Sequence, residues 1–267
     1  MKLSSCILLG LFIFIISCQK DDYTYSYPEI NKLLMSVTRI QGDSEFLAEF
    51  KYDNLNRVNE VKNFFPGGQT TIESYVYDEE GRIVEKNIEN YTTTYTYNST
   101  GKLIEQNVHY FSPSDDYEWN QKTEFIYQNG KINKGIEYSK EGEILHYISY
   151  KYDSRGNTLE KVVRPVGYDF NLIEIKFRYD TNVNPLGNTG VNMLNGFTFT
   201  QHADIKQVNN PVYSSYIRFV SSSLPPEYEI SYEYDSDKLP VKAVMNNFRF
   251  PEQEPVILEY EYRDIER

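Results

Sequence analysis

The sequence predicts an all-β protein built as an antiparallel meander of serial hairpins. Two observations support this: 25 Tyr and 15 Phe among 267 residues, and a short pattern that recurs along the chain. Aromatic residues favour strands, and no long stretch has helical periodicity. The clearest copy of the pattern is YVYDEEGRI at residues 75–83. Weaker copies begin at Phe50, Tyr95, Phe125, Tyr150, Phe177 and Tyr232.

The copies have the chemistry of a hairpin turn, except that Tyr127-Gln128 lacks the Asp and Tyr179-Asp180 lacks the Gly and the basic residue. An aromatic residue, a variable residue and a Tyr alternate, so the two rings lie on one face of a strand. The Asp that follows can accept hydrogen bonds from amides two residues on, and Gly81, Gly101, Gly156 or Asn56 can adopt a positive φ. A basic and an aliphatic residue then begin the return strand. We align Arg57-Val58, Arg82-Ile83, Lys102-Leu103, Lys131-Ile132 and Lys238-Leu239 at this place.

The remaining elements follow in chain order. Residues 32–40 alternate as a first strand, and Gly42-Asp43 is expected as a turn. Hairpins continue to Val163, after which an irregular insertion at about residues 184–226 breaks the rhythm. We expect strands at residues 197–200 and 213–220 within it, and a last strand at residues 256–262. Residues 32–267 are therefore predicted to form a single all-β repeat domain.

The first 17 residues predict a signal peptide. Lys2 precedes a short apolar run at residues 7–16, and Cys18 follows it. This resembles a bacterial lipoprotein signal with its lipobox, which implies cleavage before Cys18 and lipidation of its thiol. Residues 18–31 are expected to be a flexible tether. Its start, QKDD at residues 19–22, resembles an export signal to the outer face of the outer membrane, so we expect a lipid-anchored protein facing the cell exterior.

Composition excludes several functions. A formal net charge of −12 disfavours binding to nucleic acid, and the mature chain keeps only Cys18, so no disulfide is expected. His109, His146 and His202 are far apart and lack a metal-binding motif. Asp115-Asp116 and the acids of residues 235–237 are expected to be turn residues. We therefore predict no cofactor and no metal.

The exposed aromatic residues are the best candidates for ligand binding. Tyr110, Phe111, Tyr117 and Trp119 surround an acidic loop, and Trp119 is the only tryptophan. Aromatic rings stack on sugars and anchor protein partners. The alternative is that these rings complete the core at the end of a hairpin.

A row of glutamates offers a competing, catalytic hypothesis. Glu60, Glu85, Glu105 and Glu160 occupy the same place in four return strands. Two carboxylates flanking a glycosidic bond would make a hydrolase acting on extracellular glycans. The alternative is that each Glu pairs across strands with Lys or Arg on the wet face, because a catalytic pair needs two distinct acids and this pattern makes all units alike.

These units resemble the YD repeats of RHS-type proteins. Together with the lipobox and the acidic tether, residues 32–262 resemble a family of uncharacterised bacterial lipoproteins with a porin-like fold. The resemblance implies a long antiparallel sheet curled into a barrel or half-barrel, and brings no established activity. The strands mix Lys, Glu, Asn and Thr into their apolar positions, which does not fit a membrane barrel. We expect a surface-anchored, non-catalytic binding or structural module with a glycan or protein partner.

Overall fold

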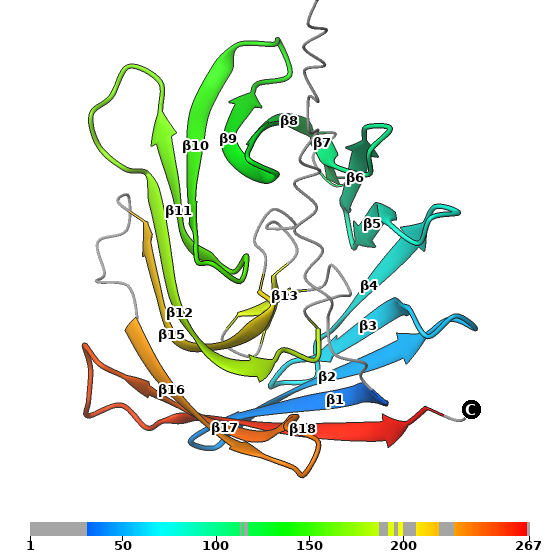
Figure 1. Cartoon of the computed structure of the whole chain (residues 1–267), viewed down its shortest axis with the longest axis vertical. Helices are drawn as coiled ribbons and strands as arrows, with labels where there is room; N and C mark the ends of the chain where they lie inside the picture. The colour runs from blue at the N-terminus through cyan, green and yellow to red at the C-terminus, as the bar shows by residue number, and fades with distance from the viewer. Residues whose placement is uncertain are drawn as a thin grey trace, which may run out of the picture.

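The computed structural model describes residues 31–112, 114, 117–186, 192–194, 197–199, 207–218 and 227–265. Within these residues, sixteen strands form one closed antiparallel barrel, and two short strands form a separate sheet. Figure 1 shows the ring, with β17, β18 and β1 along its lower side and β9 and β10 opposite them. The predicted all-β meander is confirmed, and the sheet closes into a full barrel.

The barrel strands follow one another in chain order. They are β1 (Lys32–Gln41), β2 (Ser44–Tyr52), β3 (Val58–Phe64), β4 (Thr70–Tyr77), β5 (Ile83–Ile88), β6 (Tyr91–Tyr97), β7 (Leu103–Ser112), β8 (Tyr117–Gln128), β9 (Lys131–Tyr138), β10 (Ile144–Tyr152), β11 (Thr158–Pro165), β12 (Ile173–Val183), β15 (Asn209–Arg218), β16 (Glu227–Tyr234), β17 (Pro240–Asn247) and β18 (Val256–Asp264). β1 pairs with both β2 and β18, which closes the ring. The separate sheet consists of β13 (Asn192–Leu194) and β14 (Phe197–Phe199).

The strands expected at both ends of the domain are confirmed as β1 and β18, and the two expected inside the insertion correspond to β14 and β15. The predicted signal peptide and Cys18 lie outside the described residues. Of the tether only Asn31 is described, and much of the insertion also lies outside the described part of the chain.

The two ends of the barrel differ because successive connections of a meander alternate between them. We call the end with the repeated turns, such as β2–β3 and β4–β5, the turn end, and the opposite end, with β5–β6, β7–β8, β11–β12 and β17–β18, the loop end. Lys32 Nζ lies 2.8 Å from Asp235 Oδ2 in the β16–β17 turn, and the Ile265 amide donates to the Asn31 carbonyl at 2.9 Å. The described chain therefore begins and finishes at the turn end.

Asp53 shows how the Asp after the tyrosine organises its turn, as predicted. Asp53 Oδ1 accepts hydrogen bonds from the Leu55 and Arg57 amides, both at 2.9 Å, and its Oδ2 accepts one from Arg57 Nε at 2.7 Å. Burial raises the pKa of Asp53, but the hydrogen bonds from Arg57 outweigh it and hold the pKa below its usual range. Asn56, at φ 60°, takes the left-handed position that Gly81 takes, at φ 80°, in the next unit.

Each unit is also latched to the next one. The Arg57 guanidinium lies 4.4 Å from the ring centre of Tyr77, and the Tyr77 hydroxyl donates to the Val58 carbonyl at 2.6 Å. Arg82 repeats this contact with Tyr97, at 4.8 Å, and the Tyr97 hydroxyl donates to the Ile83 carbonyl at 2.8 Å. Where a basic residue follows the turn, as with Arg57, Arg82, Lys102 and Lys131, it thus binds the aromatic ring of the following unit.

One predicted alignment is wrong. Lys238 has φ 63° and stands at the place of the glycine, so Leu239, not Lys238, occupies the position of the basic residue. Pro240 pairs with Tyr234 as Ile83 pairs with Tyr77. Lys32, from the start of the barrel, supplies the cation that Asp235 lacks within its own unit.

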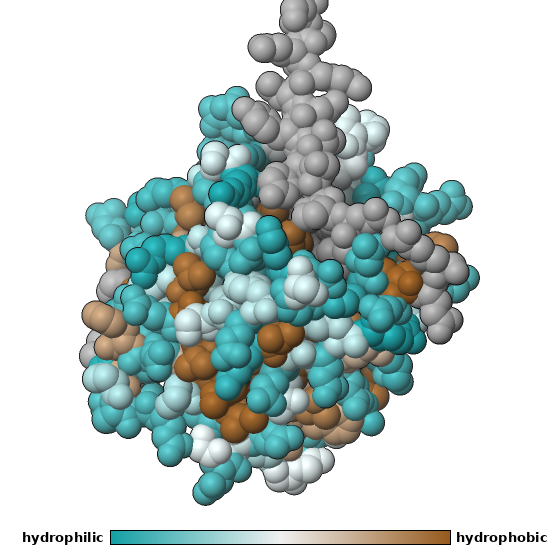
Figure 2. Space-filling model, turned by 60° about the horizontal axis from the view of Figure 1, so that its bottom comes forward, coloured by the Kyte–Doolittle hydropathy of each residue, from teal (hydrophilic) through white to brown (hydrophobic). Residues whose placement is uncertain are grey.

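The interior is apolar toward the first and last strands and more polar elsewhere. Phe50, Val61 and Met245 are among the fully buried members of the main core cluster. Buried polar residues include Thr93, Gln106 and Thr123. On the face drawn in Figure 2, hydrophobic residues form small separate groups among hydrophilic ones.

Candidate functional site

Three of the four predicted aromatic residues, Tyr110, Tyr117 and Trp119, share one face of the sheet, and Tyr91 joins them there. Tyr91, Tyr110 and Trp119 stand opposite one another across β6, β7 and β8. Two residues further along, the row Thr93, Val108 and Gln121 lies deeper on the same face, and Thr93 and Val108 are buried inside the barrel. The aromatic row therefore lines the inner rim of the loop end.

Ring contacts join this inner row to Tyr117. The Tyr110 ring lies 4.6 Å from that of Tyr91 and 6.5 Å from that of Tyr117. Tyr117 is 54% exposed, whereas Tyr110 and Trp119 are half-buried. Sequence reasoning missed Tyr91, although the alternation of β6 puts it on the same face as Tyr95.

Phe111 faces the other way. It lies between Tyr110 and Ser112 on β7, and its cross-strand partner is Glu118. Its neighbour on the outer face, His109, lies 3.2 Å from the Glu118 carboxylate. Phe111 is 44% exposed, so the four predicted residues form an inner group of three and one ring on the outside.

All seven aromatic residues that are exposed in the described part of the chain lie toward the loop end. Six of them are in a loop there or within two residues of one: Tyr91, Phe111, Tyr117, Tyr168, Phe170 and Phe248. The seventh, Tyr147, is on the outer wall of β10, with Lys134 Nζ 4.0 Å from its ring centre. The turn end exposes no aromatic ring among the described residues, since its tyrosines point inward.

The glutamate row lies on the outer wall and is paired. Glu60 and Glu160 form ion pairs with their cross-strand partners Lys51 and Lys151, at 2.6 and 2.8 Å. Glu85 and Glu105 instead accept hydrogen bonds from Asn87 and Asn107, both at 2.8 Å. Two of the four expected basic partners are thus present, and two are replaced by amides.

A buried charged cluster inside the barrel was not predicted. Lys86 Nζ lies 2.9 Å from Glu73 Oε2, and the two side chains are 4% and 2% exposed. Tyr75 donates to the same carboxylate oxygen at 2.8 Å. Burial lowers the pKa of Lys86, while Glu73 acts in the opposite direction. Strand alternation could have placed Glu73 beside Tyr75, but nothing in the sequence pairs either with Lys86.

The histidines and metal sites give a simple result. His109 contacts Glu118, His146 contacts Glu137, and His202 lies outside the described residues. Within the described residues there is no group of three or more His, Cys, Asp or Glu side chains placed to hold a metal ion. Asp115 and Asp116 also lie outside them. The same residues include no helix long and apolar enough to cross a membrane.

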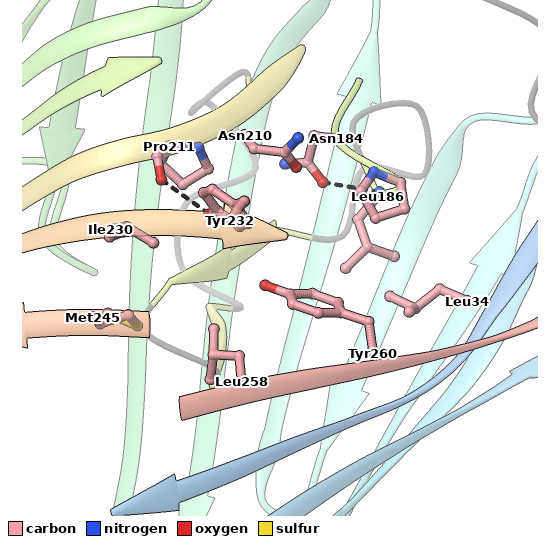
Figure 3. A pocket seen from close by; sticks show the side chains of 11 residues that line it. Leu34, Asn184, Leu186, Asn210, Pro211, Ile230, Tyr232, Met245, Leu258 and Tyr260 are labelled. Carbon is pink, nitrogen blue, oxygen red and sulfur yellow. Dashed lines mark hydrogen bonds between the residues drawn. The ribbon is translucent and has the colours of Figure 1, made fainter. Parts of the chain in front are cut away.

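A small cavity lies near the turn end, where Leu186 packs into the core (Figure 3). Its volume is about 40 Å³, enough for a few water molecules and far below the roughly 300 Å³ of a small-molecule site. Its walls are mostly apolar: Leu34, Pro185, Leu186, Pro211, Ile230, Met245, Leu258 and Tyr260, with Asn184, Asn210 and Tyr232. It is a packing defect of the core and not a ligand site.

Serial units of Tyr-Asp turns closed into a barrel define the molecule as a YD-repeat protein. The chain belongs to the Teneurin YD-shell family, whose model matches residues 13–184. No curated protein matches it. The resemblance to YD repeats is therefore confirmed.

Solved structures show the same fold. A porin-like protein from Bacteroides vulgatus is 15% identical, with a TM-score of 0.53 over 88% of this chain and 100% of its own. A porin-like protein from Bacteroides uniformis is 12% identical, with a TM-score of 0.52 over 87% of this chain and 96% of its own. The expected porin-like fold is confirmed.

Proposed function

We propose that the protein is an outer-membrane lipoprotein, anchored through Cys18, that acts as a non-catalytic binding module and recognises its partner with the loop end of the barrel. One observation carries this proposal: the exposed aromatic rings gather toward the loop end, away from the end where the chain enters. Aromatic residues are the side chains that most often anchor interfaces.

The position of the tether supports this arrangement. Residues 18–31 lead into β1 at the turn end, where Lys32 contacts the β16–β17 turn. A lipid on Cys18 would hold the turn end toward the membrane and present the loop end outward. The Bacteroides proteins of the same fold are described as porin-like, which agrees with an outer-membrane address.

The paired glutamates favour binding over hydrolysis. Glu60 and Glu160 each have a lysine partner, and Glu85 and Glu105 each have an asparagine partner. A general acid needs a carboxyl group whose environment differs from that of its companion. All four carboxylates are instead held by neighbouring side chains on the outer wall of the sheet.

Site-specific photo-crosslinking in intact cells tests the proposal. A photoreactive phenylalanine analogue replaces Tyr117, which is 54% exposed at the loop end, or Leu55, which is 65% exposed in a turn at the turn end. We expect adducts from position 117 and none from position 55. Adducts from position 55 alone, or from neither position, would contradict the proposal.

A glycan array identifies the chemical class of the partner. The full chain with a Cys18→Ser replacement, which removes the lipidation site, is compared with the same chain carrying Trp119→Ala. Glycan binding that is lost in the Trp119→Ala chain would place a sugar on the inner aromatic row.

A further inference from the structure

We propose that the loop end binds a basic polypeptide segment, whose Lys and Arg side chains stack on the exposed rings and pair with the carboxylates beside them. This rests on the proposed function, in which the loop end is the recognition surface, and names the chemistry of the partner.

Rings and acids occur together in four loops. Glu89 precedes Tyr91, and Glu118 follows Tyr117. Asp169 stands between Tyr168 and Phe170, whose rings are 5.4 Å apart. Phe248 begins the loop that carries Glu252 and Glu254. Each of these segments therefore carries both an aromatic ring and a carboxylate within a few residues of each other.

These carboxylates are exposed and lack strong cationic partners. Glu89, Asp169, Glu252 and Glu254 form no ion pair with any described residue, and Glu118 contacts His109 and accepts a hydrogen bond from Asn120 at 3.1 Å. The only arginine in these four loops is Arg249, and it is bound to Glu227 at 3.0 Å. At the turn end, by contrast, Asp53, Asp78 and Asp235 are neutralised by Arg57, Arg82 and Lys32. The acids of these four loops thus carry more uncompensated charge than Asp53, Asp78 and Asp235 do.

The molecule already uses this combination of groups internally. Arg57 bonds to Asp53 and lies 4.4 Å from the Tyr77 ring centre. On the outer wall, Arg178 lies 4.4 Å from the ring centre of Tyr213 and 3.6 Å from Glu229. A ring beside a carboxylate binds a guanidinium through both cation–π attraction and charge-assisted hydrogen bonds. At the loop end the ring and the acid are present, and the cation is what a partner would bring.

Charge also argues against the other ligands. A neutral glycan can donate hydroxyl hydrogen bonds to these acids but leaves their charge uncompensated, and an anionic glycan or membrane surface would be repelled by a chain of net charge −12. A basic segment uses the rings and the acids together.

Fluorescence anisotropy with labelled peptides tests the inference on the full chain carrying Cys18→Ser. The probes are an arginine decapeptide and a glutamate decapeptide, with neutral glycans measured on an array. We expect the arginine peptide to bind, the glutamate peptide to show no binding, and the affinity to fall as salt is added.

Matched variants separate a defined surface from general attraction to an acidic protein. Glu252→Gln/Glu254→Gln removes two charges at the loop end, and Glu79→Gln/Glu80→Gln removes two exposed charges at the turn end. Tyr117→Ala/Phe248→Ala removes two rings that are 54% and 69% exposed, with Leu55→Ala as the control for loss of exposed apolar surface. We expect about two- to fivefold weaker binding for each ring removed, a comparable loss for the loop-end acids, and almost no change for the turn-end controls.

Equal losses at the two ends would overturn the inference, as would binding of neutral glycans without binding of the arginine peptide. The crosslinking experiment keeps the two proposals apart. Adducts from position 117 with no arginine-peptide binding would refute the basic partner and leave the recognition surface standing. Adducts from neither position would refute the surface itself.

Discussion

Removing a single tyrosine hydroxyl tests the latch between units. Tyr77→Phe keeps the ring under Arg57, at 4.4 Å from its guanidinium, and deletes only the hydrogen bond of 2.6 Å to the Val58 carbonyl. A neutral hydrogen bond contributes about 1 kcal/mol net, and an acceptor left without a partner adds to the loss. We therefore expect the free energy of unfolding to fall by about 1–2 kcal/mol.

Urea denaturation measures this change, since the midpoint shifts while the slope stays constant if only stability is altered. Tyr168→Phe is the matched control, because Tyr168 is 61% exposed in the β11–β12 loop and surface changes usually stay within about 0.5 kcal/mol. If Tyr77→Phe is as neutral as Tyr168→Phe, the hydroxyl does not hold adjacent units together and the latch is only a packing contact.

Three further predictions concern the interior, the pH response and the anchor. Lys86→Met leaves Glu73 without its cation, 2.9 Å away, and should lower the free energy of unfolding, measured by urea denaturation, by about 3–5 kcal/mol. Lys51→Met, which breaks an exposed pair, should lower it by less than about 1 kcal/mol. Similar losses in the two variants would show that burial of the Lys86 pair is not what matters. Burial raises the pKa of Tyr77, Tyr97 and Tyr127 from 10.0 to about 12. The stability that these groups contribute is therefore complete below pH 10 and lost as the pH rises toward 12. A tyrosinate titration that follows free tyrosine, with no cooperative unfolding by circular dichroism, would contradict this. Cys18→Ser should abolish incorporation of a labelled fatty acid and release the chain from membranes, and a chain that stays lipidated would show that another residue carries the anchor.

Local chemistry made the hairpins predictable. The Asp, the Gly and the alternating rings act within about ten residues, so each turn could be recognised from its own letters. Side-chain contacts between strands were harder to predict from the sequence. That Arg57 lies over Tyr77, or that Lys86 meets Glu73 inside the barrel, depends on the register between neighbouring strands, and a single bulge changes which side chains share a face.

Two departures from the predicted pattern concern Lys238 and Asp180. Lys238 was aligned with the basic residue because its neighbours fit the pattern, yet a lysine at φ 63° takes the glycine position there. Asp180 Oδ1 accepts the predicted hydrogen bond from the Asn182 amide, two residues on, at 2.9 Å, but β12 runs on to Val183 and the same oxygen also accepts from the Asn210 amide at 3.2 Å. Asn210 is distant in sequence, so no local pattern could predict that partner.

The aromatic candidates were recognised as residues but not as an arrangement. Sequence proximity grouped Phe111 with Tyr110, while strand alternation puts them on opposite faces and brings Tyr91 into the inner row instead. The gathering of exposed rings toward one end also needs the topology, because Tyr91, Tyr168 and Phe248 are far apart in the chain.

Because each latch joins a unit only to the one that follows it, the number of units determines the circumference of this barrel. Residues 78–97 contain β5 and β6, and a chain without them would retain the contact of Arg57 with Tyr77 and that of Lys102 with Tyr127. Gain or loss of such a segment during evolution would therefore widen or narrow the ring by two strands while every remaining joint kept its chemistry. In a family built in this way, duplication of such a segment changes the inner diameter of the barrel and needs no new kind of contact between units.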